Sequence, residues 1–184
     1  MIKFDLDGVL IDFVHVLKFL LNRDGYETVD DTQFQFTTNP HLSKSEMWEY
    51  VIKAYPLWDI FPIYPGVYTL LQKVWHNTAT PINVITARPI ESALYTHKLL
   101  NKVMGGIPHT VALVDDGNDK LNYLDPDDIL VEDRRKTALH LAKAGVRTYL
   151  IDKPYNQIPH EHRISEITRI PDIRMMNLLT ERIR

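Results

Sequence analysis

The sequence contains no cysteine among its 184 residues. Disulfide bonds, thiolate metal sites and every mechanism with a cysteine nucleophile are therefore excluded. Long apolar runs are also missing, since the most apolar helix candidate, residues 13–21, contains His15 and Lys18 and is far too short to span a bilayer. Asp5 and Asp7 interrupt the start of the chain before a secretory leader could develop. We therefore expect a cytoplasmic protein with no membrane partner.

Long runs of a single charge are absent as well. The chain carries 21 basic and 24 acidic residues, and its densest basic cluster is only Arg134-Arg135-Lys136. A dedicated nucleic-acid binder needs a concentrated positive surface, so nucleic acid is not the expected partner. The composition, 45% apolar and 24% charged, is that of an ordinary globular domain. A chain of this length can form one core, or a core that carries an insertion.

The first stretch with chemical content is the end of a short apolar strand at residues 2–4. Asp5 and Asp7 follow this strand, and Gly8 permits a sharp turn that lets both carboxylates project towards one point. Converging carboxylates repel each other unless a cation lies between them or one of them is protonated, and Mg²⁺ suits such oxygen ligands. The spacing does not fit an EF-hand loop, in which Val16 would have to be Glu. A simple turn without catalytic role is the alternative.

Short apolar strands alternate with helices along much of the remaining chain, which predicts a parallel sheet with crossover helices. Strands are expected at residues 82–86, 110–114, 128–132 and 147–151, the last clear strand, and helices at 9–22, 43–55, 67–75, 89–104 and 134–143. Residues 24–42 read as irregular chain. Residues 13–62 interrupt the alternation, because no second strand follows the first. We therefore predict an α/β core of residues 1–12 and 63–184 with a small helical cap, residues 13–62; a helical decoration without function is the alternative.

Polar residues of particular types follow the predicted strands. In open parallel sheets, ligands bind at the carboxyl ends of the strands. Besides the first aspartates, these ends carry Thr86 and the acidic pair Glu132-Asp133, with Lys120 between them in the chain. A hydroxyl can bind phosphate oxygens, a lysine can balance their charge, and an acidic pair can complete a metal site. Singly, each residue is more often a helix cap or a surface side chain; together and in this order they predict phosphoryl-transfer chemistry.

Four motifs, taken as a set, resemble the haloacid dehalogenase superfamily of phosphotransferases. They are Phe4-Asp-Leu-Asp-Gly-Val-Leu10, Val84-Ile-Thr-Ala-Arg88, Lys120 and Ile129-Leu-Val-Glu-Asp-Arg134. The resemblance implies a Rossmann-like core in which the strand before Asp5 is central, with a cap inserted after that strand. It also implies a Mg²⁺-dependent hydrolysis of a phosphomonoester through an aspartyl-phosphate.

Roles for individual residues follow from the same resemblance. Asp5 would be the nucleophile, and Asp7 would act first as general acid and then as general base. The metal ligands would be Asp5, the backbone carbonyl of Asp7, and Asp133, with Glu132 supporting directly or through water. The phosphate would be bound by Thr86, Ala87, Arg88 and Lys120, although Arg88 could instead pair with Glu132 or Asp133.

Shorter motifs, at residues 63–66 and 152–156, look like the 5′(3′)-deoxyribonucleotidase group and its bacterial relatives. One departure is Ala87, where the better-known nucleotidases carry a polar residue. The expected substrate is a (deoxy)nucleoside monophosphate, and another small phosphomonoester or a nucleic-acid end is the alternative. The candidates for stacking on a base are Phe13, Trp48, Trp58 and Phe61, although such aromatics more often pack in a core. A homodimer is the assembly we consider.

A signalling receiver domain is the alternative from a different class, because it also uses Asp, Thr, Lys and Mg²⁺ on a parallel α/β fold. Its phosphorylated Asp would follow the third strand, and an acidic pair would follow the first. Here the first strand carries Asp5 and Asp7, and no lone Asp occupies the expected place. Among the remaining motifs, His160 and His162 are not expected to bind metal, and Tyr155-Asn156 is expected to give structural support.

Overall fold

The structure is a computed structural model that describes residues 1–26, 41–157 and 165–176. Within these residues, six parallel strands form one sheet in the order β3-β2-β1-β4-β5-β6. The strands are β1 (Ile2–Phe4), β2 (Ile82–Thr86), β3 (His109–Leu113), β4 (Ile129–Glu132), β5 (Arg147–Ile151) and β6 (Ile167–Ile170). This arrangement confirms the predicted α/β, Rossmann-like fold. The direction of winding reverses between β1 and β4, and such a switch point opens a crevice at the carboxyl ends of the strands.

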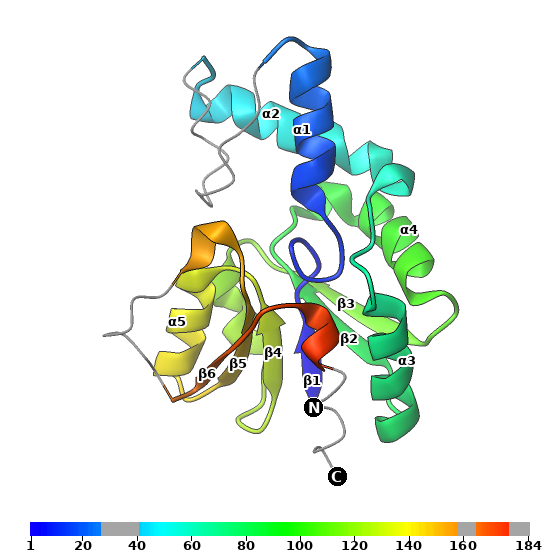
Figure 1. The fold of residues 1–184 in the computed structure, drawn as a ribbon, viewed down its shortest axis with the longest axis vertical. Helices are drawn as coiled ribbons and strands as arrows, with labels where there is room; N and C mark the ends of the chain where they lie inside the picture. Colours follow the sequence, from blue (N-terminus) through cyan, green and yellow to red (C-terminus); the bar gives the residue numbers. More distant parts are fainter. Residues whose placement is uncertain (27–40, 158–164, 177–184) are drawn as a thin grey trace.

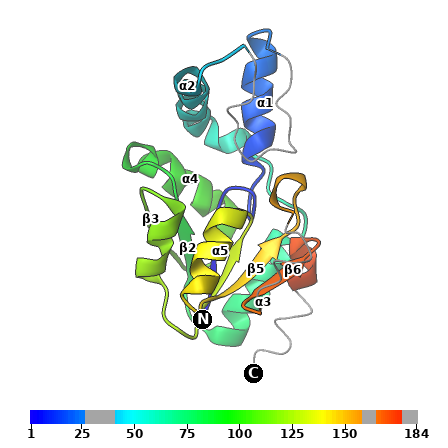
Figure 2. The ribbon, with the colours of Figure 1, turned by 90° about the vertical axis from the view of Figure 1, so that its left-hand side faces the viewer.

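Helices cover both faces of the sheet (Figures 1 and 2). The helices α3 (Val67–Thr78) and α4 (Ala93–Met104) lie against one face, and α5 (Arg135–Lys143) lies against the other. Apolar residues on both faces of the sheet are fully buried, which matches the continuous apolar character of its strands. No helix in the described part of the chain is long and apolar enough to cross a membrane.

A separate helical layer stands beyond the carboxyl ends of the strands (Figure 1). It consists of α1 (Phe13–Arg23), α2 (Lys44–Ala54) and the 3₁₀ helix η1 (Tyr55–Ile60). A capping box closes the start of α2: the backbone N–H of Glu46 donates to the hydroxyl of Ser43, and the Glu46 carboxylate accepts from the Ser43 N–H. The chain leaves the sheet layer and returns to it side by side, because Ile11 and Ile63 form an antiparallel bridge.

Several predicted boundaries differ from the structure. The helix predicted at residues 9–22 begins only at Phe13, because the preceding residues form a tight turn in which the Leu10 N–H donates to Leu6 O over 2.9 Å. The helix predicted at residues 89–104 begins as a short 3₁₀ helix, η2 (Ile90–Ser92), before α4. The strand β6 was not predicted. Most of the stretch predicted as irregular chain, and both His160 and His162, lie outside the described residues.

Candidate active site

The turn after β1 determines where the two aspartates point. The N–H of Asp5 still bonds to Val131 O on β4 over 2.9 Å, so Asp5 stands at the last paired position of the strand. Gly8 has a φ of +76°, which favours glycine. A Cβ at Gly8 would lie 1.9 Å from Oδ2 of Asp133, so only glycine lets this carboxylate approach the turn. The short motif thus positions Asp5 and Asp7 and also admits Asp133.

Three buried carboxylates gather at this edge of the sheet. One oxygen from each of Asp5, Glu132 and Asp133 lies within 4.8 Å of the other two. The ammonium of Lys120 lies 2.9 Å from Oδ1 of Asp5 and 2.8 Å from Oε2 of Glu132. Three carboxylates and one ammonium leave two excess negative charges when all are ionised. The structure therefore brings together four residues that the sequence placed at separate strand ends and loops.

Protonation in this cluster reflects its burial and crowding. Burial raises the pKa of Asp5 to about 7, and the charges of Glu132 and Asp7 act in the same direction while Lys120 opposes them. Burial, followed by the charges of Glu132 and Asp5, also raises the pKa of Asp133. Oδ1 of Asp5 is buried and accepts no well-directed hydrogen bond, although it is ion-paired with Lys120. An all-oxygen cluster with two excess negative charges fits a hard divalent cation such as Mg²⁺.

Glu132 is tied into the protein through both of its oxygens. Oε1 accepts the backbone N–H groups of Asp133 and Arg134, at 3.0 and 2.9 Å, and Oε2 accepts from Lys120. The side chain is fully buried. Lys120 itself is placed by the 3₁₀ helix η3 (Gly117–Tyr123), which packs on α5 so closely that a Cβ at Gly117 would meet the Thr137 hydroxyl at 2.4 Å. Glu132 thus suits a supporting role, holding Lys120 and the start of α5.

Asp133 has partners that the sequence did not reveal. The hydroxyl of Tyr155 donates to its Oδ2. The amide of Asn156 donates to the carbonyls of Asp133 and Ile151, at 2.7 and 2.6 Å. Asn156 therefore gives the structural support expected of it, whereas Tyr155 reaches the acidic cluster and lines the cavity beside it. The motif at residues 152–156 was the available signal, but it does not say which side chain turns inward.

Asp7 is held by Arg88 from the neighbouring strand end. Nη2 and Nε of Arg88 donate to the two carboxylate oxygens of Asp7, at 2.7 and 2.8 Å. Arg88 is only 1% exposed and does not line the cavity, whereas the side chain of Asp7 is 29% exposed and does. This placement does not favour the prediction that Arg88 binds phosphate, because its charge is directed at Asp7. Nor does Arg88 pair with Glu132 or Asp133 among the described residues.

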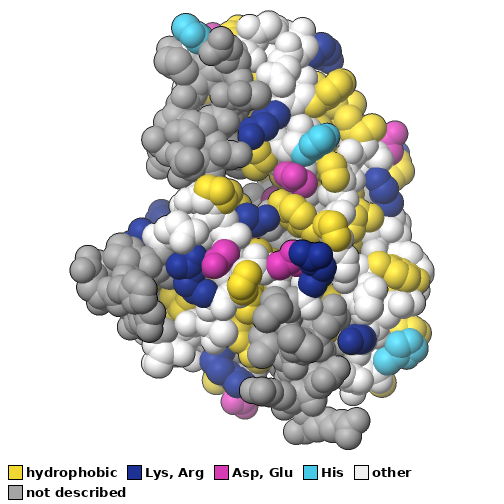
Figure 3. Space-filling model, viewed as in Figure 1, with side chains coloured by type: hydrophobic (Ala, Val, Ile, Leu, Met, Phe, Trp, Pro, Cys, Tyr) yellow, Lys and Arg dark blue, Asp and Glu magenta, His cyan; other side chains and the backbone are white. Residues whose placement is uncertain are grey.

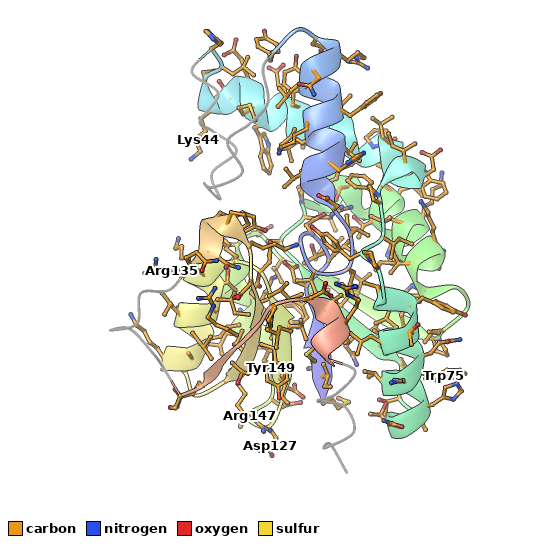
Figure 4. The ribbon with its side chains drawn as sticks, viewed as in Figure 1. Lys44, Trp75, Asp127, Arg135, Arg147 and Tyr149 are labelled. Atoms are coloured by element: carbon orange, nitrogen blue, oxygen red, sulfur yellow. The ribbon has the colours of Figure 1, made fainter. Side chains whose placement is uncertain are left out.

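A cavity of about 430 Å³ connects these groups with the helical layer. Figure 3 shows acidic and basic side chains along the waist between the two layers. The sheet layer contributes Asp5, Asp7, Gly8, Thr86, Ala87, Gly117, Lys120, Glu132, Asp133, Arg134, Thr137 and Tyr155, and the helical layer contributes Phe13, Val14, Lys44, Met47, Trp48, Val51 and Tyr55. Figure 4 shows Lys44 at the start of α2, directed towards the sheet layer. The end of the cavity at the sheet layer is thus charged, whereas the end at the helical layer is lined, apart from Lys44, by apolar and aromatic side chains.

Of the four aromatic residues predicted to stack on a base, two line this cavity and two do not. Phe13 and Trp48 line it. Phe61 is buried behind Phe13, with which it stacks at a centroid distance of 5.5 Å. Trp58 lies elsewhere, with the ammonium of Lys98 6.0 Å from its ring centroid. The positions of Trp58 and Phe61 therefore do not support a contact with substrate.

No family model matches the chain, and no curated protein matches it in sequence. Solved structures do resemble it over nearly its whole length. A putative phosphatase from Clostridium difficile is 16% identical with a TM-score of 0.63, covering 97% of both chains. A protein described as a predicted phosphoglycolate phosphatase from Haemophilus somnus is 15% identical with a TM-score of 0.64, covering 98% of this chain and 97% of the other.

A third similar structure carries a family name. A subfamily IA hydrolase of the haloacid dehalogenase (HAD) superfamily from Geobacter sulfurreducens is 13% identical with a TM-score of 0.59, covering 97% of this chain and 95% of the other. At such identities the likeness establishes the fold. The chain therefore has the Rossmann-like α/β fold seen in HAD-superfamily proteins, as the sequence motifs led us to expect.

Proposed function

We propose that the chain is a Mg²⁺-dependent phosphomonoester hydrolase in which Asp5 is the nucleophile. The observation that carries this proposal is the convergence of Asp5, Thr86, Lys120 and Asp133 on one cavity. These residues supply a nucleophile, a hydroxyl donor, a counter-charge for phosphate and a metal ligand. The similar structures described as phosphatases support the same activity.

The first step joins Asp5 to the phosphoryl group. A carboxylate oxygen of Asp5 attacks phosphorus while the bond from phosphorus to the ester oxygen breaks on the opposite side. Asp7 donates a proton to the departing alkoxide, which leaves as an alcohol. The Thr86 hydroxyl and the Lys120 ammonium bind the non-bridging oxygens, whose negative charge would otherwise repel the approaching carboxylate.

The second step releases phosphate. Asp7, now ionised, takes a proton from a water molecule, whose oxygen attacks phosphorus as the bond to Asp5 breaks. Inorganic phosphate leaves, and Asp5 and Asp7 return to their starting states. In the proposed site, Mg²⁺ would be held by Asp5, Asp133 and the backbone carbonyl of Asp7, with Glu132 in support. Bound there, it would supply positive charge that offsets the repulsion between the carboxylate and the phosphate.

The proposed substrate is a (deoxy)nucleoside monophosphate, as for a 5′(3′)-deoxyribonucleotidase. The charged end of the cavity suits the phosphate, and the apolar end, lined by Phe13 and Trp48, suits a base. Residues 13–62 would then act as a cap that completes the binding site. A small phosphomonoester without an aromatic group, such as the phosphoglycolate named for one similar structure, is the second candidate. A cytoplasmic location and a homodimer belong to the same proposal.

A phosphate-release screen tests this function. Nucleoside monophosphates, sugar phosphates and phosphoglycolate are compared with Mg²⁺ and with excess chelator. We expect release from the nucleotides, its loss in chelator, and its loss in Asp5→Asn with unchanged thermal unfolding. Asp127→Asn, at the opposite end of the sheet (Figure 4), is the matched control and should stay active. Undiminished activity of Asp5→Asn would contradict the assignment, and a stable phosphoprotein without turnover would favour a receiver-like domain.

A further inference from the structure

We infer that Arg88 is a positioning residue for Asp7, held in place by the aromatic rings of Phe13, Tyr55 and Phe61. The inference rests on the proposed function, since it concerns the group that moves protons in that reaction. It differs from the role that the sequence suggested for Arg88, which was to bind phosphate directly.

The contact between Arg88 and Asp7 is of the kind that fixes a carboxylate in two directions. Nη2 lies 2.7 Å from Oδ1, and Nε lies 2.8 Å from Oδ2. Such paired bonds orient the carboxylate plane, which a single ammonium cannot do. Arg88 approaches Asp7 from the interior, because Arg88 is 1% exposed while Asp7 faces the cavity. The pair therefore leaves the cavity side of Asp7 open to substrate and water.

Three aromatic rings lie close to the Arg88 guanidinium. Its central carbon lies 4.9 Å from the ring centroid of Tyr55, 5.5 Å from that of Phe61 and 5.8 Å from that of Phe13. Phe13 packs on both of the other rings, at 5.5 and 5.9 Å between centroids. Cation–π contacts in a desolvated setting are stronger than those at the surface. The guanidinium thus has few other orientations open to it.

The two halves of this arrangement come from different layers. Arg88 and Asp7 belong to the sheet layer, whereas Phe13 begins α1 and Tyr55 begins η1. Any shift of the helical layer away from the sheet would remove rings from the guanidinium and loosen its hold on Asp7. A general acid or base must lie within hydrogen-bond reach of its proton partner, so this hold sets the efficiency of proton transfer. The packing of the helical layer is therefore coupled to the orientation of Asp7.

Leaving-group chemistry separates this role from direct phosphate binding. p-Nitrophenolate leaves without a proton, so with p-nitrophenyl phosphate the first step does not need Asp7, whereas the second step still does. For Arg88→Lys, which keeps the charge but not the paired bonds, we expect a retained burst of about one p-nitrophenolate per enzyme, followed by turnover slowed about 10²-fold. With nucleoside monophosphates, whose leaving group needs the proton, the burst should be lost as well.

Two further variants keep the test independent of folding defects. Phe61→Leu changes a ring that does not line the cavity and should show the same pattern in weaker form, about tenfold slower turnover with a retained burst. Leu71→Val, an equally buried change in α3, should leave both phases unchanged. Thermal unfolding of each variant confirms that it is folded. Unchanged turnover of Phe61→Leu, or an equal slowing of Phe61→Leu and Leu71→Val, would overturn the role of the rings.

A double-variant cycle with Asp7→Asn supplies the sharpest outcome. If Arg88 acts through Asp7, adding Arg88→Lys to Asp7→Asn should slow turnover no further, within about threefold. A further drop of about tenfold or more, or an equal loss of burst and turnover in Arg88→Lys alone, would show that Arg88 acts on the phosphate instead. Unchanged turnover of Arg88→Lys would also overturn the inference. Failure of the unaltered chain to release phosphate from any substrate would instead contradict the proposed function.

Discussion

Removing the positive charge of Lys120 is the perturbation to which the proposed site should respond most strongly. Its ammonium lies 2.9 Å from a carboxylate of Asp5 and 2.8 Å from one of Glu132, and it is fully buried. At an effective dielectric constant of about 20, each contact corresponds to a Coulomb energy of about 6 kcal/mol. Much of this offsets the cost of burying the charges, so the expected net loss for Lys120→Met is about 3–5 kcal/mol of unfolding free energy.

The same change should alter the response to Mg²⁺. Lys120 opposes the rise in the pKa of Asp5, so its removal should raise this pKa further above about 7 and leave Asp5 protonated at neutral pH in metal-free protein. An added divalent cation can replace the lost positive charge. We therefore expect Mg²⁺ to raise the unfolding free energy of Lys120→Met more than that of the unaltered chain, while phosphate release is lost.

Urea unfolding with and without Mg²⁺, alongside phosphate release, measures both effects. Lys143→Met, an exposed lysine at the end of α5, is the control and should match the unaltered chain in both assays. A loss of unfolding free energy of less than about 1 kcal/mol in Lys120→Met, with turnover retained, would refute the electrostatic reasoning. Removal of a buried ammonium leaves two buried carboxylates without their positive partner, which is strongly destabilising.

Three further predictions concern the turn after β1, the cavity, and the end of the sheet at which β1 and β4 begin. Gly8→Ala should abolish phosphate release, because its Cβ would displace a site carboxylate lying 1.9 Å away. Trp48→Ala should lower kcat/KM for nucleotides about tenfold, since it removes a stacking face from the cavity wall. Asp128 is buried, which would raise its pKa, but its bonds to Lys3, to the N-terminal ammonium and to the backbone N–H of Asp125 lower the pKa to about 2. Asp128→Asn should therefore cost about 2 kcal/mol of unfolding free energy at pH 7, and this difference should vanish as the pH falls from about 4 to 2.

Matched controls separate these effects from general disturbance. Gly145→Ala shares a positive φ, +81°, but its Cβ would meet nothing within 4 Å, so activity should survive there. Equal inactivation of the two glycine variants would contradict a clash at Gly8. Trp58→Ala should leave kcat/KM unchanged, and a loss as large as that of Trp48→Ala would argue against the cavity as the base site. A difference between Asp128→Asn and the unaltered chain that stays at about 2 kcal/mol down to pH 2 would contradict the linkage.

The sequence predicted the fold well because its signals were local and strong. The strands at residues 82–86 and 147–151 have the predicted bounds, since short β-branched and apolar runs between polar turns have few alternatives. Lys120 could be predicted as a site residue from the order of the motifs along the chain. It lies in a short 3₁₀ helix without a periodic pattern, so its position between two strand-end motifs was the signal that indicated it. The edge strand β6 was missed because it is four residues long and half-buried.

Pairings between distant side chains were the part that sequence could not supply. Arg88 comes two residues after Thr86, the last residue of β2, which suggested a phosphate ligand, yet its carboxylate partner is Asp7, 81 positions away. Tyr155 reaches Asp133 only because the chain turns back after β5. Residue type states what a side chain can bind, but the partner depends on which strand ends become neighbours and on which charges share one buried space.

The most direct test of the central claim is to find the phosphoryl group on the protein. Asp7→Asn is mixed with Mg²⁺ and p-nitrophenyl phosphate, quenched in acid, and digested for mass spectrometry. The first step needs no proton with this substrate, and the second step lacks its base, so phosphoenzyme should accumulate with its phosphoryl group on the peptide that contains Asp5. A burst of p-nitrophenolate with no phosphorylated peptide, or with phosphate on a different residue, would contradict the claim that Asp5 is the nucleophile.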